Sequence, residues 1–320
     1  MKNHLKPMGV RDILDSTFTI LRENFWAFQG VIFKAFLPAI VILLLGTGVT
    51  VGYIVLVGRH THIPIDNPLF WSEIGHNSLL AIILGILLLL IIVIAFIIAL
   101  IIGGIYFTYS NFKIFKNGLH DQKTTSKEAF QGIKGNRVRI FLVQFIIGIL
   151  LFVVAIPGVI ISIIVKLQAP FMSTIISLAN DFLRIIVSFF FCMALPVTVF
   201  EDSDVMKSIS RNFQLMAKHR WRVFWTLLLA YLLGYALGII ILGLIAIPIA
   251  LAFVFKNIVA YIGAGFFCIG GLFIFSLLFS YCFGPLTAIY YDLIIRKEGY
   301  DISLQLADEG GVASHGQFLS

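Results

Sequence analysis

Six long apolar runs constrain the fold of this chain more than any other feature of its sequence. They lie near residues 29–57, 79–107, 138–165, 172–200, 222–251 and 262–292. Each run has at least the roughly 20 residues that an α-helix needs to cross the hydrocarbon core of a bilayer. None alternates with the two-residue period of a barrel strand, and a helix satisfies its own backbone groups in lipid. The runs therefore predict an all-α polytopic membrane protein with six transmembrane helices.

The composition supports the same interpretation. Hydrophobic residues make up 60% of the 320 residues, whereas a soluble globular domain is about half apolar. A soluble core cannot bury this excess, so lipid is the expected solvent. The net charge of +7 comes from cations in short segments between the apolar runs, which is typical of membrane proteins. We therefore expect membrane lipids, and not nucleic acid, as the partner of the basic residues.

The distribution of the basic residues predicts the orientation in the membrane. Of the 23 Lys and Arg residues, eighteen lie at the N-terminus or after the second, fourth and sixth runs. The loops on the opposite side contain only Arg59, Lys166 and Lys256. Because Lys and Arg accumulate in the cytoplasmic loops of membrane proteins, we expect a multi-pass cell-membrane protein with both termini in the cytoplasm.

A repeated motif indicates internal duplication. It reads Phe-Gln, five residues, then Arg-x-Arg-[Ile/Val]-Phe, and it occurs at residues 130–141 and 213–224. The N-terminal segment, with Arg22 and Trp26, resembles a weaker third copy. We therefore predict one integral membrane domain over residues 1–299, built from three units that each consist of an amphipathic cytoplasmic surface helix and a helical hairpin. The unit boundaries are about 9–107, 126–200 and 203–299, and the polar tail over 300–320 is expected to be disordered.

The segment before the first run is amphipathic. Its apolar residues recur at steps of three and four: Val10, Ile13, Leu14, Thr17, Phe18, Leu21 and Phe25. This pattern predicts a helix that lies at the membrane surface or, as the alternative, packs on the helical bundle.

Basic residues stand between each repeated surface segment and the apolar run that follows. They are Arg137, Arg139, Lys218, Arg220 and Arg222. At the bilayer surface each such cation contributes about 1 kcal/mol of attraction to an anionic membrane. We predict that these residues bind anionic lipid headgroups on the cytoplasmic face, and a soluble protein partner remains an alternative.

One pair of opposite charges lies within an apolar run. Asp181 and Arg184 are three residues apart, so on a helix they can form an ion pair. A charge in hydrocarbon costs roughly 2.5–3.5 kcal/mol on insertion scales, so pairing is expected if the residues are buried in the membrane. The alternative is that they mark the outer water boundary, since Ser173, Ser177 and Asn180 precede them.

Two further clusters could hold a metal ion. Glu201, Asp202, Ser203 and Asp204 precede an amphipathic segment, and capping of that helix is the favoured interpretation. His60, His62, Asp66, Glu73 and His76 share the loop after the first run, but without the spacing of known zinc sites, which favours a solvated loop. No hydrolase, zinc-protease or phosphate-loop motif occurs. We therefore expect no catalytic, cofactor or metal site and no enzymatic activity.

Several stretches together resemble a known family. They are Gly9–Asp15, Leu195–Glu201, Lys218–Phe224 and Ile289–Asp301. The chain resembles the bacterial membrane domain that is fused to some glycerophosphoryl diester phosphodiesterases and also occurs alone. The family's hydrolase is a separate barrel domain, which needs about 250 residues that this chain lacks, so no catalytic residues can be transferred. The resemblance implies a stand-alone multi-pass bacterial membrane protein.

Three functions remain open at this point. The distinctive residues cluster on the cytoplasmic side, which favours a non-enzymatic scaffold or accessory protein that binds lipid or a protein partner. The repeats and the prolines within the runs are compatible with a small transporter or lipid-handling protein. An intramembrane enzyme is the third hypothesis, and no catalytic constellation supports it.

Overall fold

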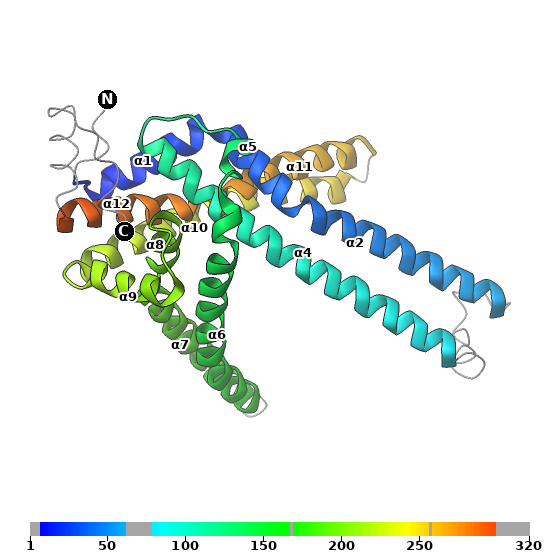
Figure 1. Ribbon diagram of the computed structural model, residues 1–320. Coiled ribbons are helices and arrows are strands. Elements are labelled where there is room, and N and C mark those ends of the chain that lie inside the picture. The colour runs from blue at the N-terminus through cyan, green and yellow to red at the C-terminus, as the bar shows by residue number, and fades with distance from the viewer. Residues whose placement is uncertain (1–6, 62–78, 167–168, 256–257, 299–320) are drawn as a thin grey trace. The chain divides into compact units, whose positions relative to one another are not determined.

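The computed structural model describes residues 7–61, 79–166, 169–255 and 258–298, and every element in these ranges is helical. Figure 1 labels the helices. Their bounds are α1 Val10–Glu23, α2 Phe25–Thr61, α4 Leu79–Leu119, α5 Ser126–Ala129, α6 Ile133–Lys166, α7 Pro170–Phe190, α8 Ala194–Phe200, α9 Val205–Met216, α10 Arg220–Phe255, α11 Ile258–Tyr281 and α12 Phe283–Glu298. The predicted tail over 300–320 lies outside the described residues.

The six predicted spans are confirmed by length and composition. The helical segments apolar enough to cross a membrane are Phe25–Leu56, Ile83–Leu119, Ile133–Lys166, Pro170–Phe200, Arg220–Leu251 and Gly265–Lys297. Few of their side chains are buried within the protein. Large apolar groups such as Phe152 and Ile163 on α6 are more than half exposed, which a chain tolerates only when lipid surrounds it.

The described chain forms two compact units. The smaller unit is Val31–Phe107, and the larger unit combines Met1–Gly30 with Thr108–Ser320. In the smaller unit α2 and α4 approach closely at Gly103, where an added Cβ atom would lie 2.5 Å from the Ala35 carbonyl oxygen. Small residues permit such backbone contact between membrane helices.

The larger unit contains a tightly packed aromatic core. The ring of Phe112 on α4 stacks edge-on against Phe200 of α8 and Phe283 of α12, with centroids 5.7 and 5.0 Å apart. Phe28 contacts Phe115 at 4.9 Å, and Phe28, Phe112 and Phe115 are at most 1% exposed. The chain therefore has a buried core of the kind found in soluble domains in addition to its apolar hairpins.

The apolar stripe of α1 is buried in this core. Ile13, Thr17 and Ile20 are at most 5% exposed, and α1 packs on α11 and α12. Of the two interpretations of the N-terminal stripe, packing on the bundle is therefore the one that the structure supports. The charged side of α1 faces outward, which keeps it a surface helix.

The fourth and sixth spans are each divided into two helices. The fourth breaks at residues 191–193, between α7 and α8, and the sixth breaks at Cys282, between α11 and α12. The shorter helices of these two spans are α8 and α12. In each, the hydroxyl of a buried threonine donates to the carbonyl four residues earlier, over 2.7 Å for Thr198 in α8 and 2.8 Å for Thr287 in α12. Two spans therefore end in short, buried helices that belong to the aromatic core.

Each hairpin is held by contacts between its two helices. In the third hairpin α10 and α11 pack together, and the Tyr281 hydroxyl donates to the Ala230 carbonyl, 3.1 Å away. A Cβ atom on Gly234 would lie 3.0 Å from the Tyr281 ring. Small residues such as Gly234 allow this close packing of spans five and six.

The two Arg-x-Arg motifs occupy equivalent places. Arg139, on α6, donates to the carbonyl of Asp202, three residues before α9 begins. Arg222, on α10, donates to the carbonyl of Met8, two residues before α1 begins. In each repeat the second arginine therefore binds the backbone just ahead of a different surface helix.

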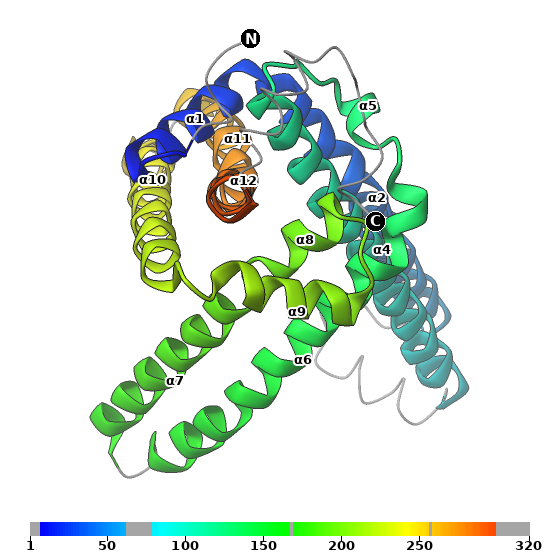
Figure 2. The ribbon, with the colours of Figure 1, turned by 60° about the vertical axis from the view of Figure 1, so that its left-hand side comes forward.

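A third contact completes a cycle. Asn24, between α1 and α2, accepts a hydrogen bond from the Thr124 N–H over 3.2 Å, two residues before α5. Three such contacts therefore exist: Asn24, just before α2, binds the segment before α5, Arg139 on α6 binds the segment before α9, and Arg222 on α10 binds the segment before α1. Figure 2 shows α1, α5 and α9 arranged around α8 and α12.

Candidate functional site

A pocket of about 490 Å³ opens in the larger unit between the end of α4, the start of α6 and the end of α8. The α4 helix contributes Tyr109, Lys113 and Lys116, while Arg139 comes from α6 and Asp202 from the segment after α8. The α4 helix has 41 residues, about 60 Å at 1.5 Å per residue. This is about twice the hydrocarbon thickness of a bilayer, so its lysine-bearing end extends beyond the apolar part.

The ammonium group of Lys113 is fixed by backbone carbonyls. It donates to the Glu128 oxygen at 2.8 Å and to the Gln131 oxygen at 2.6 Å. An ammonium has three protons to donate, so one remains for a further acceptor. Lys116, one turn along the same face, has its Nζ atom 5.8 Å from the centroid of the Phe200 ring. The pocket therefore contains two lysines in defined positions.

A capping box holds the carbonyls that fix Lys113. The Glu128 N–H donates to the Thr125 hydroxyl at 3.3 Å, and the Thr125 N–H donates back to the Glu128 carboxylate at 2.9 Å. The hydrogen bond that the carboxylate accepts from the Thr125 N–H stabilises its charged form and is the main reason that the pKa of Glu128 is lowered. The short α5 helix is thereby fixed at its start, as the sequence Thr-Ser-Lys-Glu favours.

Gly132 lies in the turn between α5 and α6 and lines the pocket. Its φ of +88° lies in the region that glycine adopts without strain. A Cβ atom at this position would lie 2.8 Å from the Tyr109 hydroxyl, which donates to the Gln131 carbonyl at 3.3 Å. Both the turn and the space available require glycine between α5 and α6.

Arg139 and Asp202 form the rim of the pocket. Arg139 donates to the Asp202 carbonyl, and its Nε lies 3.5 Å from a carboxylate oxygen of Asp204. The Asp202 side chain accepts a hydrogen bond from Asn136. The backbone φ of Asp202 is +50°, which is uncommon for a residue other than glycine, although Asp is among the residues that tolerate it. The pocket is therefore lined by three cations and one carboxylate.

The acidic segment does not cap α9 in the way that the sequence predicted. Asp204 occupies the N-cap position without a side-chain capping hydrogen bond. Glu201 accepts from Arg211 at 3.2 Å and from the Tyr290 hydroxyl at 3.0 Å. The capping prediction was wrong because these carboxylates bind partners on α6, α9 and α12 that are distant from them in the sequence.

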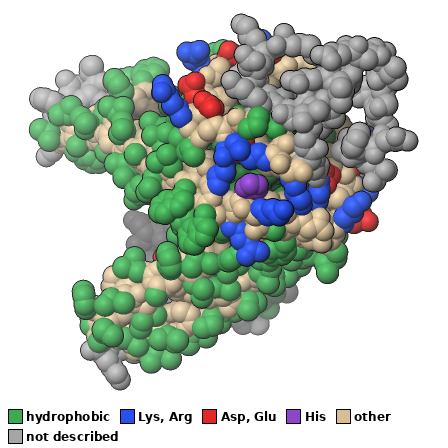
Figure 3. Space-filling view, turned by 90° about the vertical axis from the view of Figure 1, so that its left-hand side faces the viewer, with side chains coloured by type: hydrophobic (Ala, Val, Ile, Leu, Met, Phe, Trp, Pro, Cys, Tyr) green, Lys and Arg blue, Asp and Glu red, His purple; other side chains and the backbone are tan. Residues whose placement is uncertain are grey.

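The five cations predicted to bind headgroups divide into two groups. Lys218 and Arg220 are exposed immediately before or at the start of α10. Arg139 and Arg222 turn toward protein carbonyls and carboxylates, and Arg137 is half-buried. Figure 3 shows Lys and Arg side chains gathered on one face of the protein.

Lys113 and Lys116 are two of the eighteen basic residues whose distribution predicts the orientation. Their spacing of three residues places both on one helix face, which was the signal available in the sequence. It could not identify Phe200 and the α5 carbonyls as their neighbours.

Asp181 and Arg184 lie close together on α7. The Nη1 and Oδ1 atoms are 3.4 Å apart, and the side chains are 63% and 48% exposed. The polar residues that precede them face α6 instead: Asn180 donates to the Ala155 carbonyl at 3.3 Å, and Ser177 is 2.9 Å from Ser162. The polar side of α7 therefore holds the second hairpin together.

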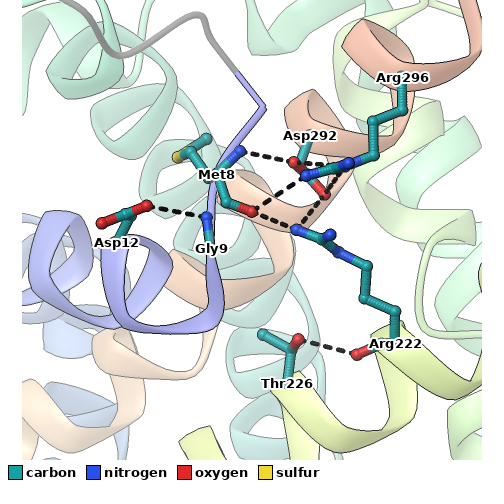
Figure 4. Close-up of polar contacts among 7 residues, drawn as sticks. All are labelled: Met8, Gly9, Asp12, Arg222, Thr226, Asp292 and Arg296. Carbon is teal, nitrogen blue, oxygen red and sulfur yellow. Dashed lines mark hydrogen bonds and ion pairs between the residues drawn. The ribbon is translucent and has the colours of Figure 1, made fainter.

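A second charged cluster, which sequence reasoning did not single out, surrounds Asp292 on α12. Its carboxylate is 2% exposed and lies 3.1 Å from Arg222 and 3.0 Å from Arg296. It also accepts the Met8 N–H at 2.7 Å. Figure 4 shows the two guanidinium groups converging on Asp292 and on the Met8 carbonyl. Two cations and a backbone donor thus compensate one buried carboxylate.

Among the described residues no group of His, Cys, Asp and Glu is arranged to hold a metal ion. The side chains of the histidine-containing loop, from His60 to His76, lie outside this description. No family model, curated protein or solved structure matches the chain.

Proposed function

We propose that the protein is a non-catalytic scaffold or accessory protein of a bacterial cell membrane that binds anionic phospholipid headgroups at its cytoplasmic face. The observation that carries this proposal is the pair of exposed cations, Lys218 and Arg220, at the start of span α10. A cation at that junction lies near the headgroups when α10 crosses the bilayer. Exposed Trp221 and Trp225 follow on the same helix, and indole rings favour this interfacial region.

The orientation in this proposal rests on the distribution of charge. Eighteen of the 23 Lys and Arg residues belong to the side of the surface helices. The cytoplasmic leaflet is the anionic one in most cell membranes. Cytoplasmic termini therefore bring the basic face and the anionic lipids to the same side.

The acidic groups of the larger unit support a structural role over a catalytic one. Glu201 and Asp292 each bind arginine side chains, and Asp202 binds Asn136. These contacts hold α6, α9, α10 and α12 in place. A general acid or base has to face a substrate, and of these three groups only Asp202 lines the pocket.

We also propose membership of the membrane-domain family that the sequence resembles. The stretches that carry the resemblance meet in the larger unit: Gly9 is the N-cap of α1, Glu201 binds Tyr290, and Arg222 binds Asp292. These stretches thus contribute to one folded unit.

The second candidate function is a small transporter or lipid-handling protein. The polar contacts between α6 and α7, together with the charges of Asp181 and Arg184, favour it because ionisable residues within spans mark transport pathways. Substrate-dependent flux through reconstituted vesicles would distinguish it from a scaffold.

The lipid proposal is tested by measuring the lipids that remain on the purified protein. The parent and Lys218→Gln/Arg220→Gln are incubated in mild detergent with equal phosphatidylglycerol and phosphatidylcholine, and bound lipid is measured by mass spectrometry. We expect the parent to retain phosphatidylglycerol preferentially and the variant to lose much of that preference. Lys166→Gln, at the opposite end of α6, is the matched control. Equal preference in all three proteins would contradict the proposal.

A further inference from the structure

At two places in the larger unit, partly buried arginines are paired with carboxylates of the chain itself. Arg211, on α9, lies 3.2 Å from the carboxylate of Glu201, the residue that follows α8. Between α10 and α12, Arg222 and Arg296 share Asp292. At these two places the chain supplies its own anion for partly buried cations, as low-dielectric surroundings require.

Among the described residues, the lysines of the basic pocket have no close ion pair of this kind, although the carboxylates of Glu128 and Asp202 lie nearby. Within the described ranges, neither Lys113 nor Lys116 lies within ion-pair distance of a carboxylate. Lys113 contacts two carbonyl oxygens, and Lys116 lies over the Phe200 ring. Two ammonium groups three residues apart on one helix repel each other. An external anion between them would remove this repulsion.

We propose that this pocket is a binding site for one phosphate group, with Lys113 and Lys116 as its direct ligands and Arg139 at its rim. The proposal rests on the proposed function in one respect, because a lipid headgroup is one source of such a phosphate. Free inorganic phosphate is the other source, and the two share the same chemistry at the lysines.

The geometry suits a small, strongly charged ligand. A volume of about 490 Å³ accommodates a phosphate and the first atoms attached to it. Lys113 is held by the Glu128 and Gln131 carbonyls before any ligand arrives, so little side-chain entropy is lost on binding. Lysine acts as a point charge toward phosphate and does not need the bidentate geometry of arginine.

Asp202 limits which anions the pocket accepts. Its carboxylate lines the pocket and accepts from Asn136, while Arg139 binds its backbone carbonyl. Three cations and one carboxylate leave a formal lining charge of about +2. A single phosphate group matches this charge, whereas a polyphosphate would bring further negative charge against Asp202.

The test uses the full-length protein, freed of lipid, in a non-ionic detergent. Its melting temperature is followed against inorganic phosphate, dioctanoyl phosphatidylglycerol and dioctanoylglycerol, at constant ionic strength. A ligand that binds only the folded protein raises the melting temperature in proportion to its occupancy. We expect phosphate-bearing ligands to stabilise the protein and dioctanoylglycerol, which has no phosphate, to have no effect.

Lys116→Gln is the informative variant, since the Lys116 ammonium lies over the Phe200 ring without an ion pair among the described residues, and its replacement removes like-charge repulsion with Lys113. We expect its melting temperature without ligand to equal or exceed that of the parent, and its phosphate dissociation constant to rise about tenfold, as for loss of a charge-assisted hydrogen bond. Lys134→Gln, an exposed lysine on the first turn of α6, should bind as the parent does.

The ligand that stabilises the protein shows whether the bound phosphate group comes from free phosphate or from a lipid headgroup. Stabilisation by inorganic phosphate identifies free phosphate as a ligand, and stabilisation by phosphatidylglycerol alone identifies the headgroup. Both results support the site if Lys116→Gln weakens them. No stabilisation by either ligand, or unchanged affinity in Lys116→Gln, would overturn it. Because Lys218 and Arg220 are intact throughout, failure here leaves their effect on lipid retention as a separate result.

Discussion

Arg222 and Asp292 bring together the two ends of the described chain. The Nη2 atom of Arg222 lies 3.1 Å from the Asp292 carboxylate, and the same guanidinium donates to the carbonyl of Met8. Met8 and Asp292 are 284 positions apart and joined by a 2.7 Å hydrogen bond. Contacts of α10 and α12 with the segment before α1 therefore join the end of the described chain to its beginning.

The first prediction is that Asp292→Asn destabilises the protein by about 2–4 kcal/mol. Removing one partner of a buried ion pair costs roughly 3–5 kcal/mol, and the arginines here are partly exposed, which reduces the cost. Thermal melting in detergent measures the loss. Hydrogen exchange should increase first in α1, which loses its link through Met8, and only later in α9.

Asp204→Asn is the matched control, because Asp204 is 86% exposed and its contact with Arg139 is long, at 3.5 Å. Such a pair contributes at most about 1 kcal/mol. Equal melting temperatures for Asp292→Asn and Asp204→Asn would contradict the structural role assigned to Asp292.

The second prediction concerns the turn before α6. Gly132→Ala should destabilise the protein by at least 1–2 kcal/mol, roughly the cost of a positive φ for a residue with a Cβ atom. The close approach to the Tyr109 hydroxyl adds to this cost. Gly135→Ala is the control, since a Cβ atom there meets open space within α6, and alanine favours a helix by about 0.5–1 kcal/mol. Chemical or thermal denaturation should therefore give opposite signs for the two variants.

The third prediction concerns pH. Burial and then the nearby Lys116 lower the pKa of His120 below its ordinary value of 6.5, and Asp121 only partly opposes them. The unfolded chain therefore binds a proton that the folded protein does not, so stability should fall as the pH decreases below about 6.5. His120 also packs edge-on against Tyr291 with centroids 5.9 Å apart.

His120→Gln should lose part of this pH dependence. The comparison is the difference in melting temperature between about pH 7.5 and pH 5.5, measured in parent and variant, because the remaining histidines are common to both. An identical pH dependence in the two proteins would show that His120 titrates normally.

The fourth prediction concerns Asp181 and Arg184. If their part of α7 lies in hydrocarbon, Asp181→Asn leaves a cation without its partner at a cost of roughly 2.5–3.5 kcal/mol. We therefore expect Asp181→Asn to give a lower yield and melting temperature than Asp181→Asn/Arg184→Gln. Equal behaviour of parent, single and double variants would mean that the pair is solvated and contributes nothing.

The sequence predicted the spans well because length and apolarity are local properties. Each of the six runs coincides with a described span to within a few residues, apart from α4 and α6, which extend into polar sequence. The breaks at 191–193 and Cys282 each lie three residues before a proline, Pro196 or Pro285, which has no N–H to donate to the carbonyl four residues earlier. The packing of α8 and α12 around Phe112 is a tertiary effect that the sequence did not reveal.

The candidate site was less predictable for the same reason. The basic character of the segment after span two was evident, and so was the repeated Arg-x-Arg motif. The contacts of Lys113 with the α5 carbonyls and of Arg222 with Asp292 depend on residues that are 15 or more positions away in the sequence. Sequence periodicity cannot determine such pairings, so the contacts of Arg139 and Arg222 with the backbone of Asp202 and Met8 were not predicted.

The proposed binding of anionic lipid requires the basic face to lie in the cytoplasm, and topology reporters measure this. Compartment-sensitive reporters are fused after Lys207, in α9, and near Asn67, in the loop between the first two spans. We predict a cytoplasmic signal at Lys207 and an external signal at Asn67. A cytoplasmic signal at Asn67, or an external one at Lys207, would contradict both the orientation and the proposed lipid contacts.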